Sequence, residues 1–238
     1  MSPAQVAVIQ HLLGTFPNPV RVLEWGSGNS SLYFTTMLES VGRDYEWVSV
    51  ESDPKWQQAV TKAAHTSLVG GLKIRLVDFG GINPRHAALP SAVREKYVGV
   101  AAELDTPIDL VIIDGRLRRR CLAEARKLQQ NGLVNVICLM DANKEYRLAD
   151  EQHSLSGEVI QAGVYPYRAK HKPLAIWIGC ANPDRLKRTL ADLNANVDLD
   201  DIISHSDVQH RRRNSWYGRL KRRIGRRISR PKTLSIQI

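Results

Sequence analysis

The 238-residue sequence contains only three cysteines, Cys121, Cys138 and Cys180, and their odd number and irregular spacing do not indicate disulfide bonds. Cys138 and Cys180 lie in apolar runs typical of strands, so we expect buried thiols in a reducing compartment. No stretch approaches the length of about 18 apolar residues that a membrane span needs. The first residues also lack a basic segment followed by an apolar core, so the sequence predicts a cytoplasmic protein without a secretion signal.

Acidic residues are absent from the last 28 positions, which hold 11 of the 34 Lys and Arg residues. The preceding residues 1–210 carry the other 23 basic residues and all 24 acidic ones, so this part is nearly neutral. The formal charge of +10 is therefore concentrated at one end of the chain. We predict one domain over residues 1–210, long enough to bury a full core, and a basic tail over residues 211–238.

The apolar side chains of the tail fall within one arc of about 120° on a helical wheel, and most of the arginines lie outside it. These side chains are Trp216, Tyr217, Leu220, Ile224 and Ile228. The pattern is typical of a helix on an anionic membrane surface, so residues 211–230 are predicted to make the protein peripheral at the inner face of the membrane. Arg227 interrupts the apolar stripe. An arginine-rich arm that binds RNA and a solvated tail without a partner are the alternatives.

Patterns typical of strands and helices alternate along the first 180 residues. Strands are expected at 20–24, 45–50, 72–77, 108–113, 132–140, 159–168 and 172–180, and helices at 2–13, 30–42, 53–68, 91–104, 118–130 and 182–193. The connections between the first five strands are too long for hairpins. The sequence therefore predicts an α/β fold with a doubly wound, mostly parallel seven-stranded sheet that has helices on both faces.

Residues 21–31, Arg-Val-Leu-Glu-Trp-Gly-Ser-Gly-Asn-Ser-Ser, are predicted to form a strand, a glycine turn and the start of a helix. Gly26 and Gly28 lack a Cβ, which allows a sharp turn and the close approach of a ligand. The helix expected to begin near Ser30 presents unpaired N–H groups in its first turn. Together these features predict a nucleotide-type binding corner at the carboxyl end of a strand.

Each of the first five predicted strands ends at or next to an acidic residue: Glu24, Glu51, Asp78, Asp114 and Asp141. The carboxyl ends of parallel strands border one crevice, so these carboxylates are expected to converge. A carboxylate can accept both hydroxyls of a ribose, and Glu24 before the turn favours a cationic ligand over a phosphate. Position 31 is serine where the dinucleotide motif G-x-G-x-x-G requires glycine, so a dinucleotide is the less favoured alternative.

The segment Glu24-Trp25-Gly26-Ser27-Gly28-Asn29-Ser30 resembles the first motif of the class I S-adenosylmethionine-dependent methyltransferases, E/D-x-G-x-G-x-G, with Ser30 in place of the third glycine. The resemblance covers roughly residues 1–180 and implies a Rossmann-like fold that binds S-adenosyl-L-methionine. It implies that Glu51 holds the ribose, that Asp78 and Phe79 hold the adenine, and that Asp114 lies near the reacting end. The implied cofactor-binding residues are Glu24, Gly26, Ser27, Gly28, Ser30, Glu51, Ser52, Asp78, Phe79 and Asp114.

The expected catalytic side chains are Asp114, Arg116 and His171. Asp114 follows an apolar strand at the mouth of the crevice, where a carboxylate can act as a general base. Arg116 is the first of four arginines after that strand, which can clamp an anionic group, although a solvated helix end is the alternative. His171, or His86 in the long connection 79–107, can act as a base near pH 7, and a merely exposed histidine is the alternative.

A divalent cation site is a further hypothesis, because Asp114, Asp141 and Asn143 resemble the ligand set of some O-methyltransferases of this fold. Oxygen ligands suit magnesium or calcium. Ala142, however, separates Asp141 from Asn143, whereas the two residue types are adjacent in that family. A helix cap at Asp141 is therefore the preferred interpretation, and no metal site is predicted.

The segment 108–119, followed by Cys121, Asp141 and Tyr146, is also similar to a bacterial subgroup of methyltransferases associated with surface-polysaccharide and small-molecule biosynthesis. We therefore expect methyl transfer from S-adenosylmethionine to an oxygen, or less readily a nitrogen, of a small molecule or glycan intermediate. An RNA methyltransferase that uses the basic tail is less favoured, because Asp114-Gly115-Arg116-Leu117 stands where an N-P-P-Y type motif is usual. A non-catalytic binding protein on the same scaffold is the other alternative.

Overall fold

The computed structural model describes residues 1–67, 69–84, 86–104, 106–142, 156–164, 173–199 and 201–203. His171, Asn143 and the predicted tail at 211–238 lie outside the described residues. The hypotheses that concern them, including the division of the chain at residue 210, therefore stay predictions.

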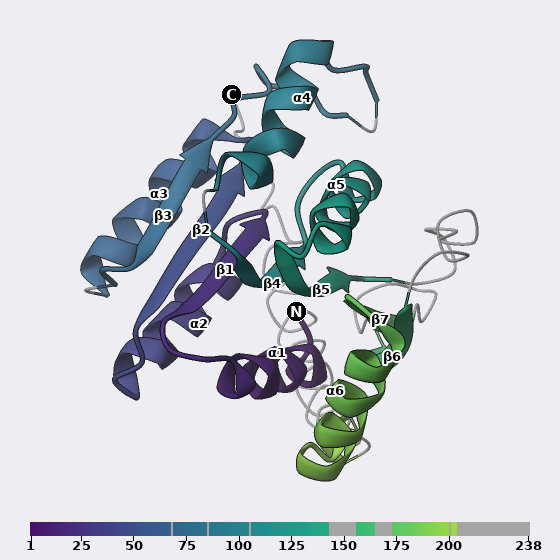
Figure 1. The fold of residues 1–238 in the computed structure, drawn as a ribbon. Helices are drawn as coiled ribbons and strands as arrows, with labels where there is room; N and C mark the ends of the chain where they lie inside the picture. The colour runs from purple at the N-terminus through teal and green to yellow at the C-terminus, as the bar shows by residue number, and fades with distance from the viewer. Residues whose placement is uncertain are drawn as a thin grey trace, which may run out of the picture.

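A single seven-stranded sheet runs through the described chain, with the order β3-β2-β1-β4-β5-β7-β6 (Figure 1). The strands are β1 (Val20–Trp25), β2 (Tyr45–Glu51), β3 (Leu72–Leu76), β4 (Ile108–Ile113), β5 (Val134–Met140), β6 (Ser156–Val164) and β7 (Pro173–Cys180). Strands β1 to β5 are parallel to their neighbours, whereas β7 is antiparallel to both β5 and β6. The predicted mostly parallel, seven-stranded α/β fold is confirmed.

Helices cover both faces of the sheet. The helices α1 (Pro3–Thr15), α2 (Asn29–Ser40) and α6 (Pro183–Asn196) bury one core, and α4 (Ser91–Gly99), the 3-10 turn η1 (Val100–Glu103) and α5 (Arg118–Gln130) bury the other. Helix α3 (Pro54–Thr66) packs along β2 and β3 beside α2. In β4, Leu110 and Ile112 belong to the first core and Val111 and Ile113 to the second, which explains why this strand is apolar throughout.

Local capping signals fix the starts of three helices where the sequence predicts them. Ser2 accepts a hydrogen bond from the N–H of Gln5, Asp53 accepts two from the first turn of α3, and Asn182 accepts one from the N–H of Arg185. The predicted helix 91–104 is different, because α4 ends at Gly99 and continues only as the turn η1. Glycine is a poor helix former, which accounts for the change.

Strand β6 begins at Ser156, three residues before its predicted start at 159. Ser156 and Gly157 have low strand propensity, but they pair with Cys180 and Gly179 of β7. Pairing with the neighbouring strand therefore sets the start of β6. The three cysteines are buried and free, as predicted. Within the described ranges, no helix combines the length and the apolar character needed to cross a bilayer.

Candidate active site

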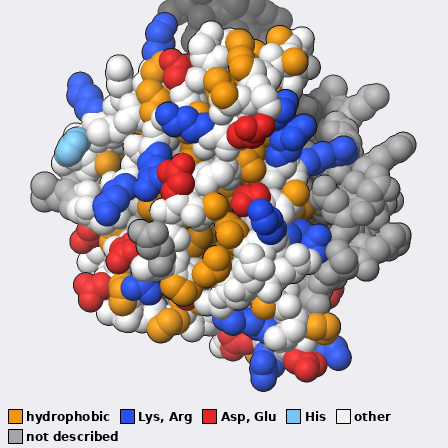
Figure 2. Space-filling model, turned by 45° about the horizontal axis from the view of Figure 1, so that its top comes forward, with side chains coloured by type: hydrophobic (Ala, Val, Ile, Leu, Met, Phe, Trp, Pro, Cys, Tyr) orange, Lys and Arg blue, Asp and Glu red, His pale blue; other side chains and the backbone are white. Residues whose placement is uncertain are grey.

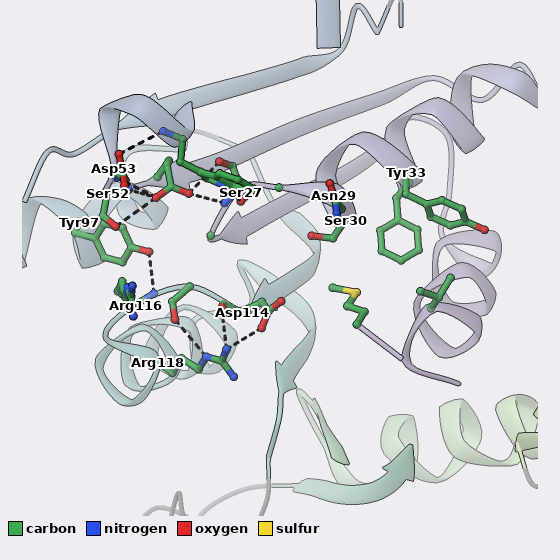
Figure 3. A pocket seen from close by; sticks show the side chains of 18 residues that line it. Ser27, Asn29, Ser30, Tyr33, Ser52, Asp53, Tyr97, Asp114, Arg116 and Arg118 are labelled. Carbon is green, nitrogen blue, oxygen red and sulfur yellow. Dashed lines mark hydrogen bonds and ion pairs between the residues drawn. The ribbon is translucent and has the colours of Figure 1, made fainter. Parts of the chain in front are cut away.

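A cavity of about 720 Å³ opens at the carboxyl ends of β1, β2 and β4 (Figure 3). Its walls are the glycine turn after β1, the first turn of α2, residues 51–53 after β2 and residues 114–116 after β4. Small-molecule sites usually enclose roughly 300–1,000 Å³ and lie outside the carboxyl ends of the strands in open α/β sheets. The cavity therefore lies at the predicted position, and its size suits a nucleoside-type ligand.

Gly26 begins the turn after β1 with a φ of 103°. A Cβ at this position would stand 2.6 Å from the Cα of Gly115, so the turns after β1 and β4 touch backbone to backbone. The N–H of Gly26 donates to the carbonyl oxygen of Val50 at 2.9 Å. The predicted need for glycine at this position is confirmed. The backbone that approaches it closely is that of the turn after β4.

Glu24 is fully buried and does not line the cavity. Its Oε1 accepts a hydrogen bond from the hydroxyl of Ser30 at 2.6 Å, and its Oε2 accepts from Ser31, Trp47 and Ser49 at 2.5, 3.1 and 3.0 Å. Burial raises the pKa of Glu24 to about 7, against the opposing effect of these four donors. The expectation that Glu24 faces the ligand is thus corrected, because the carboxylate fastens the start of α2 to the sheet from behind the cavity wall.

Glu51 lies on the cavity wall and is only 8% exposed. Its Oε2 accepts from the N–H and the hydroxyl of Ser27 at 3.2 and 3.0 Å. Its Oε1 accepts from the N–H groups of Ser52 and Asp53 at 2.6 and 3.0 Å. The structure therefore brings together three predicted cofactor-binding residues, Glu51, Ser27 and Ser52, in one hydrogen-bonded group.

Asp114 and Asp141, which follow neighbouring strands, are both bound by Arg118. The Nη2 of Arg118 lies 2.8 Å from Oδ1 of Asp114, and its Nη1 lies 3.3 Å from Oδ2 of Asp141. The guanidinium also donates to the carbonyl oxygens of Asp114, Gly115 and Met140 at 2.8, 3.2 and 2.7 Å. Burial raises the pKa of the Asp114 carboxyl. The positive charge of Arg118 lowers this pKa, and the negative charge of Asp141 raises it further.

The sequence did not distinguish Arg118 from the neighbouring arginines. In the structure, its side chain links the residues that follow β4 and β5 (Figure 3). Because its guanidinium binds both Asp114 and Asp141, it already neutralises the carboxylates that the cation hypothesis requires. Among the described residues, no group of three His, Cys, Asp or Glu side chains could hold a metal ion. The geometry of Asp114 and Asp141 thus favours an arginine clamp over a cation site.

Tyr97 lines the cavity although nothing in the sequence marked it for this role. It is 1% exposed, and its hydroxyl oxygen accepts from the N–H of Arg116 at 3.3 Å. Its carbonyl oxygen accepts from Nε1 of Trp25 at 3.0 Å, and burial holds the pKa of the phenol well above its usual range. The spacing of Tyr97 from Val93 and Val100 indicates a buried helix face, but not that the hydroxyl meets the β4 turn.

Two aromatic side chains on the cavity wall were also missed. Trp56 is 48% exposed, and its Nε1 donates to the carbonyl oxygen of Ser27 at 2.8 Å, which fixes the ring beside the glycine turn. Tyr33 of α2 is 49% exposed. A tryptophan two residues after a capping Asp-Pro pair, in the first turn of the helix, is a weak signal that could have drawn attention to Trp56.

Asp78 and Phe79, which the resemblance places at the adenine, are not on the wall of this cavity. Asp78 is exposed and accepts from the N–H of Gly80 at 2.8 Å, which makes it a turn former. Phe79 is 4% exposed, and its ring meets that of Tyr97 edge to face at 5.1 Å. His86 is exposed in a turn and does not line the cavity either.

The strand order, the glycine turn and the cavity together define a Rossmann-like fold of the class I methyltransferase type. Among solved structures, an rRNA methylase from Streptococcus thermophilus matches with a TM-score of 0.50 and 10% sequence identity, over 76% of this chain and 97% of that chain. The identity is low, so this likeness shows the fold.

Two further solved structures are similar. The protein SMU.1697c from Streptococcus mutans, in complex with SAH, matches with a TM-score of 0.49 and 8% identity, over 76% of this chain and 98% of that chain. A precorrin-6y C5,15-methyltransferase from Geobacter metallireducens matches with a TM-score of 0.45 and 12% identity, over 74% of this chain and 87% of that chain. The sequence matches no family model and no curated protein.

Proposed function

We propose that this protein is an S-adenosylmethionine-dependent methyltransferase that acts on an oxygen, or less readily a nitrogen, of a small molecule or glycan intermediate. The observation that carries the proposal is the 720 Å³ cavity, which joins the glycine turn, Glu51 and Asp114 at the carboxyl ends of three parallel strands. Proteins of this fold act on many different substrates, so the chemistry of the site must indicate the reaction.

The residues of the cavity fit a ligand that carries both a positive sulfur and a carboxylate. Glu51, Asp53 and Asp114 supply negative charge along the walls. The first turn of α2, with Asn29 and Ser30 on the wall, supplies the positive end of a helix dipole, which favours a carboxylate. Glu51 would hold the ribose hydroxyls in exchange for the hydroxyl groups of Ser27 or Ser52.

Bound S-adenosylmethionine would supply an electrophilic methyl group on a positively charged sulfur. Asp114 is suited to remove the proton of the acceptor, because Arg118 holds its Oδ1 while its Oδ2 makes no hydrogen bond with the described residues. The raised pKa makes Asp114 a stronger base than an ordinary aspartate. Trp56 and Tyr97 would shield the ligand from water on the side of α3 and α4.

RNA is a second candidate acceptor, and the observation that favours it is the cluster of arginines at the start of α5, beside the cavity. The fold likeness to an rRNA methylase agrees with this candidate. RNA binding that weakens steeply with salt would support it, because each phosphate contact releases counterions.

The test of the proposed function is a calorimetric titration of the full chain with S-adenosylhomocysteine and, separately, with NAD. We expect saturable one-to-one binding of S-adenosylhomocysteine and much weaker binding of NAD, because the carboxylate of Glu51 lies against the glycine turn, where the dinucleotide motif places its pyrophosphate. The absence of binding at millimolar S-adenosylhomocysteine, or tighter binding of NAD, would contradict the proposal.

A further inference from the structure

A second cavity of about 470 Å³ adjoins the candidate active site and is walled mainly by arginines. Its lining includes Arg116, Arg118, Arg119, Arg120, Pro84 and Leu117. Gly115, Arg116 and Arg118 also line the first cavity, so the two spaces share a wall. No acidic side chain of the described chain lines the second cavity, so all its charged lining side chains are arginines.

The arginines of this cavity differ in what they bind within the protein. Arg118 is 13% exposed and is held by Asp114 and Asp141. Arg116 and Arg120 are exposed, and their guanidinium groups make no hydrogen bond or ion pair with the described residues. These two side chains are therefore available to a ligand. The space-filling view shows Lys and Arg side chains interspersed with Asp and Glu side chains among apolar atoms (Figure 2).

The position of the cluster on α5 adds a second reason to expect an anion. Three arginines occupy the first turn of the helix, which contains no acidic residue. The residue before the helix, Leu117, has a φ of 52° and gives no side-chain hydrogen bond to the helix start. The helix dipole is positive at this end and repels the guanidinium groups. A bound anion would relieve both the repulsion among the arginines and their repulsion by the helix.

We propose that this arginine cavity is a subsite for a phosphoryl group of the acceptor substrate. The inference rests on the proposed methyltransferase function and narrows its substrate class to phosphate-bearing acceptors. Planar guanidinium groups bind phosphate oxygens in pairs, which suits Arg116 and Arg120. Because Arg116 lines both cavities, a phosphoryl group held there places the rest of the acceptor beside Asp114.

The test compares phosphate-bearing probes on the full chain and its variants. Binding of ribose 5-phosphate, of ribose, and of a short single-stranded RNA is measured for the wild type, Arg116→Gln, Arg120→Gln and Arg188→Gln. Arg188 is an exposed arginine of α6, a helix that packs beside α1 and not at this cavity, so its variant removes the same charge elsewhere. Thermal unfolding checks that each variant is folded.

We expect Arg116→Gln and Arg120→Gln to weaken binding of at least one phosphate-bearing probe by about tenfold, and Arg188→Gln to change it less than about twofold. Loss confined to ribose 5-phosphate identifies a small phosphomonoester, and loss confined to RNA identifies a phosphodiester. Ribose is expected to bind equally weakly to all four proteins. Equal weakening by Arg120→Gln and Arg188→Gln would overturn the inference, because binding would then follow net charge alone.

A titration of Arg120→Gln with S-adenosylhomocysteine separates the two proposals. Arg120 does not line the first cavity, so this variant is expected to bind S-adenosylhomocysteine like the wild type. If Arg120→Gln binds S-adenosylhomocysteine like the wild type and also binds the phosphate-bearing probes with unchanged affinity, the proposed subsite alone is overturned. Failure of every variant and of the wild type to bind S-adenosylhomocysteine would overturn the proposed function, and with it the acceptor role of the subsite.

Discussion

The hydroxyl of Ser30 donates a 2.6 Å hydrogen bond to Oε1 of Glu24, six residues earlier in the chain. Ser30 stands where the methyltransferase motif has its third glycine, so the departure from the motif creates a contact that glycine cannot make. Ser31 makes an equivalent bond to Oε2 of Glu24 at 2.5 Å. Two hydroxyls of the first turn of α2 thereby fasten the helix start to the end of β1, and the glycine turn between them is held in shape.

Ser30→Ala is expected to lower the free energy of unfolding by about 2 kcal/mol at pH 8, because it removes a hydrogen bond to a buried, ionised carboxylate. Urea unfolding followed by circular dichroism measures the change. Ser40→Ala is the matched control, since the Ser40 hydroxyl is exposed in the same helix and bonds only to the carbonyl oxygen of Met37. An equally small effect of both variants would show that the Ser30 contact contributes nothing special.

Glu24 is expected to make the protein less stable as the pH rises from about 4.5 to about 7. The folded state binds the proton of Glu24 more tightly than the unfolded state, so the stabilisation is fully present below the unfolded pKa and is lost as the pH passes the folded pKa. The loss is on the order of 3 kcal/mol for a shift of this size.

Glu24→Gln removes the titrating group while keeping its shape, so its unfolding free energy should lack this decrease between pH 4.5 and pH 7. The difference between the wild type and the variant, measured by urea unfolding across the pH range, isolates the contribution of Glu24. A difference that stays constant with pH would contradict the raised pKa.

Arg118→Gln is expected to raise the pKa of Asp114 further, because the variant removes the cation that stabilises the ionised carboxylate at 2.8 Å. NMR titration of the carbon-13 labelled aspartate carboxyls measures the change directly. Arg116→Gln is the control, since Arg116 lines the same cavity but is not among the groups that shift this pKa. Equal shifts in both variants would mean that the general field of the cavity, and not the ion pair, sets the pKa.

Removal of residues 211–238 is expected to abolish binding to vesicles of anionic lipid, because this segment carries 11 basic residues and no acidic one. Flotation with vesicles of phosphatidylglycerol, and with neutral phosphatidylcholine as the control, measures the binding. Vesicle binding by the shortened chain that equals that of the full chain would contradict the predicted membrane role of residues 211–230.

Local signals predicted most of the fold. The caps at Ser2, Asp53 and Asn182 depend on contacts within three residues, so the sequence alone locates these helix starts. The apolar run of β4 reveals a strand that is buried on both faces. The strand ends predicted the edge at which Glu51 and Asp114 meet, because parallel strands end on one side of a sheet.

The roles of individual carboxylates could not be predicted in the same way. Glu24 turns away from the cavity because Trp47 and Ser49, 23 and 25 residues later in the chain, supply hydrogen-bond donors behind it. Asp114 is tied to Asp141 through Arg118, a contact that spans more than 20 residues. Tyr97 reaches the β4 turn only because α4 packs over it. Such long-range contacts leave no periodic pattern in the sequence.

The affinity of Glu51→Gln for S-adenosylhomocysteine, measured by calorimetry beside that of Glu46→Gln, tests whether the cavity binds a nucleoside. Glu51 lies on the cavity wall, whereas Glu46 is an exposed residue of the same strand. If the cavity binds the nucleoside through Glu51, Glu51→Gln should weaken binding at least about tenfold and Glu46→Gln should leave it unchanged. Equal affinity of Glu51→Gln and the wild type, with both proteins folded, would contradict the account.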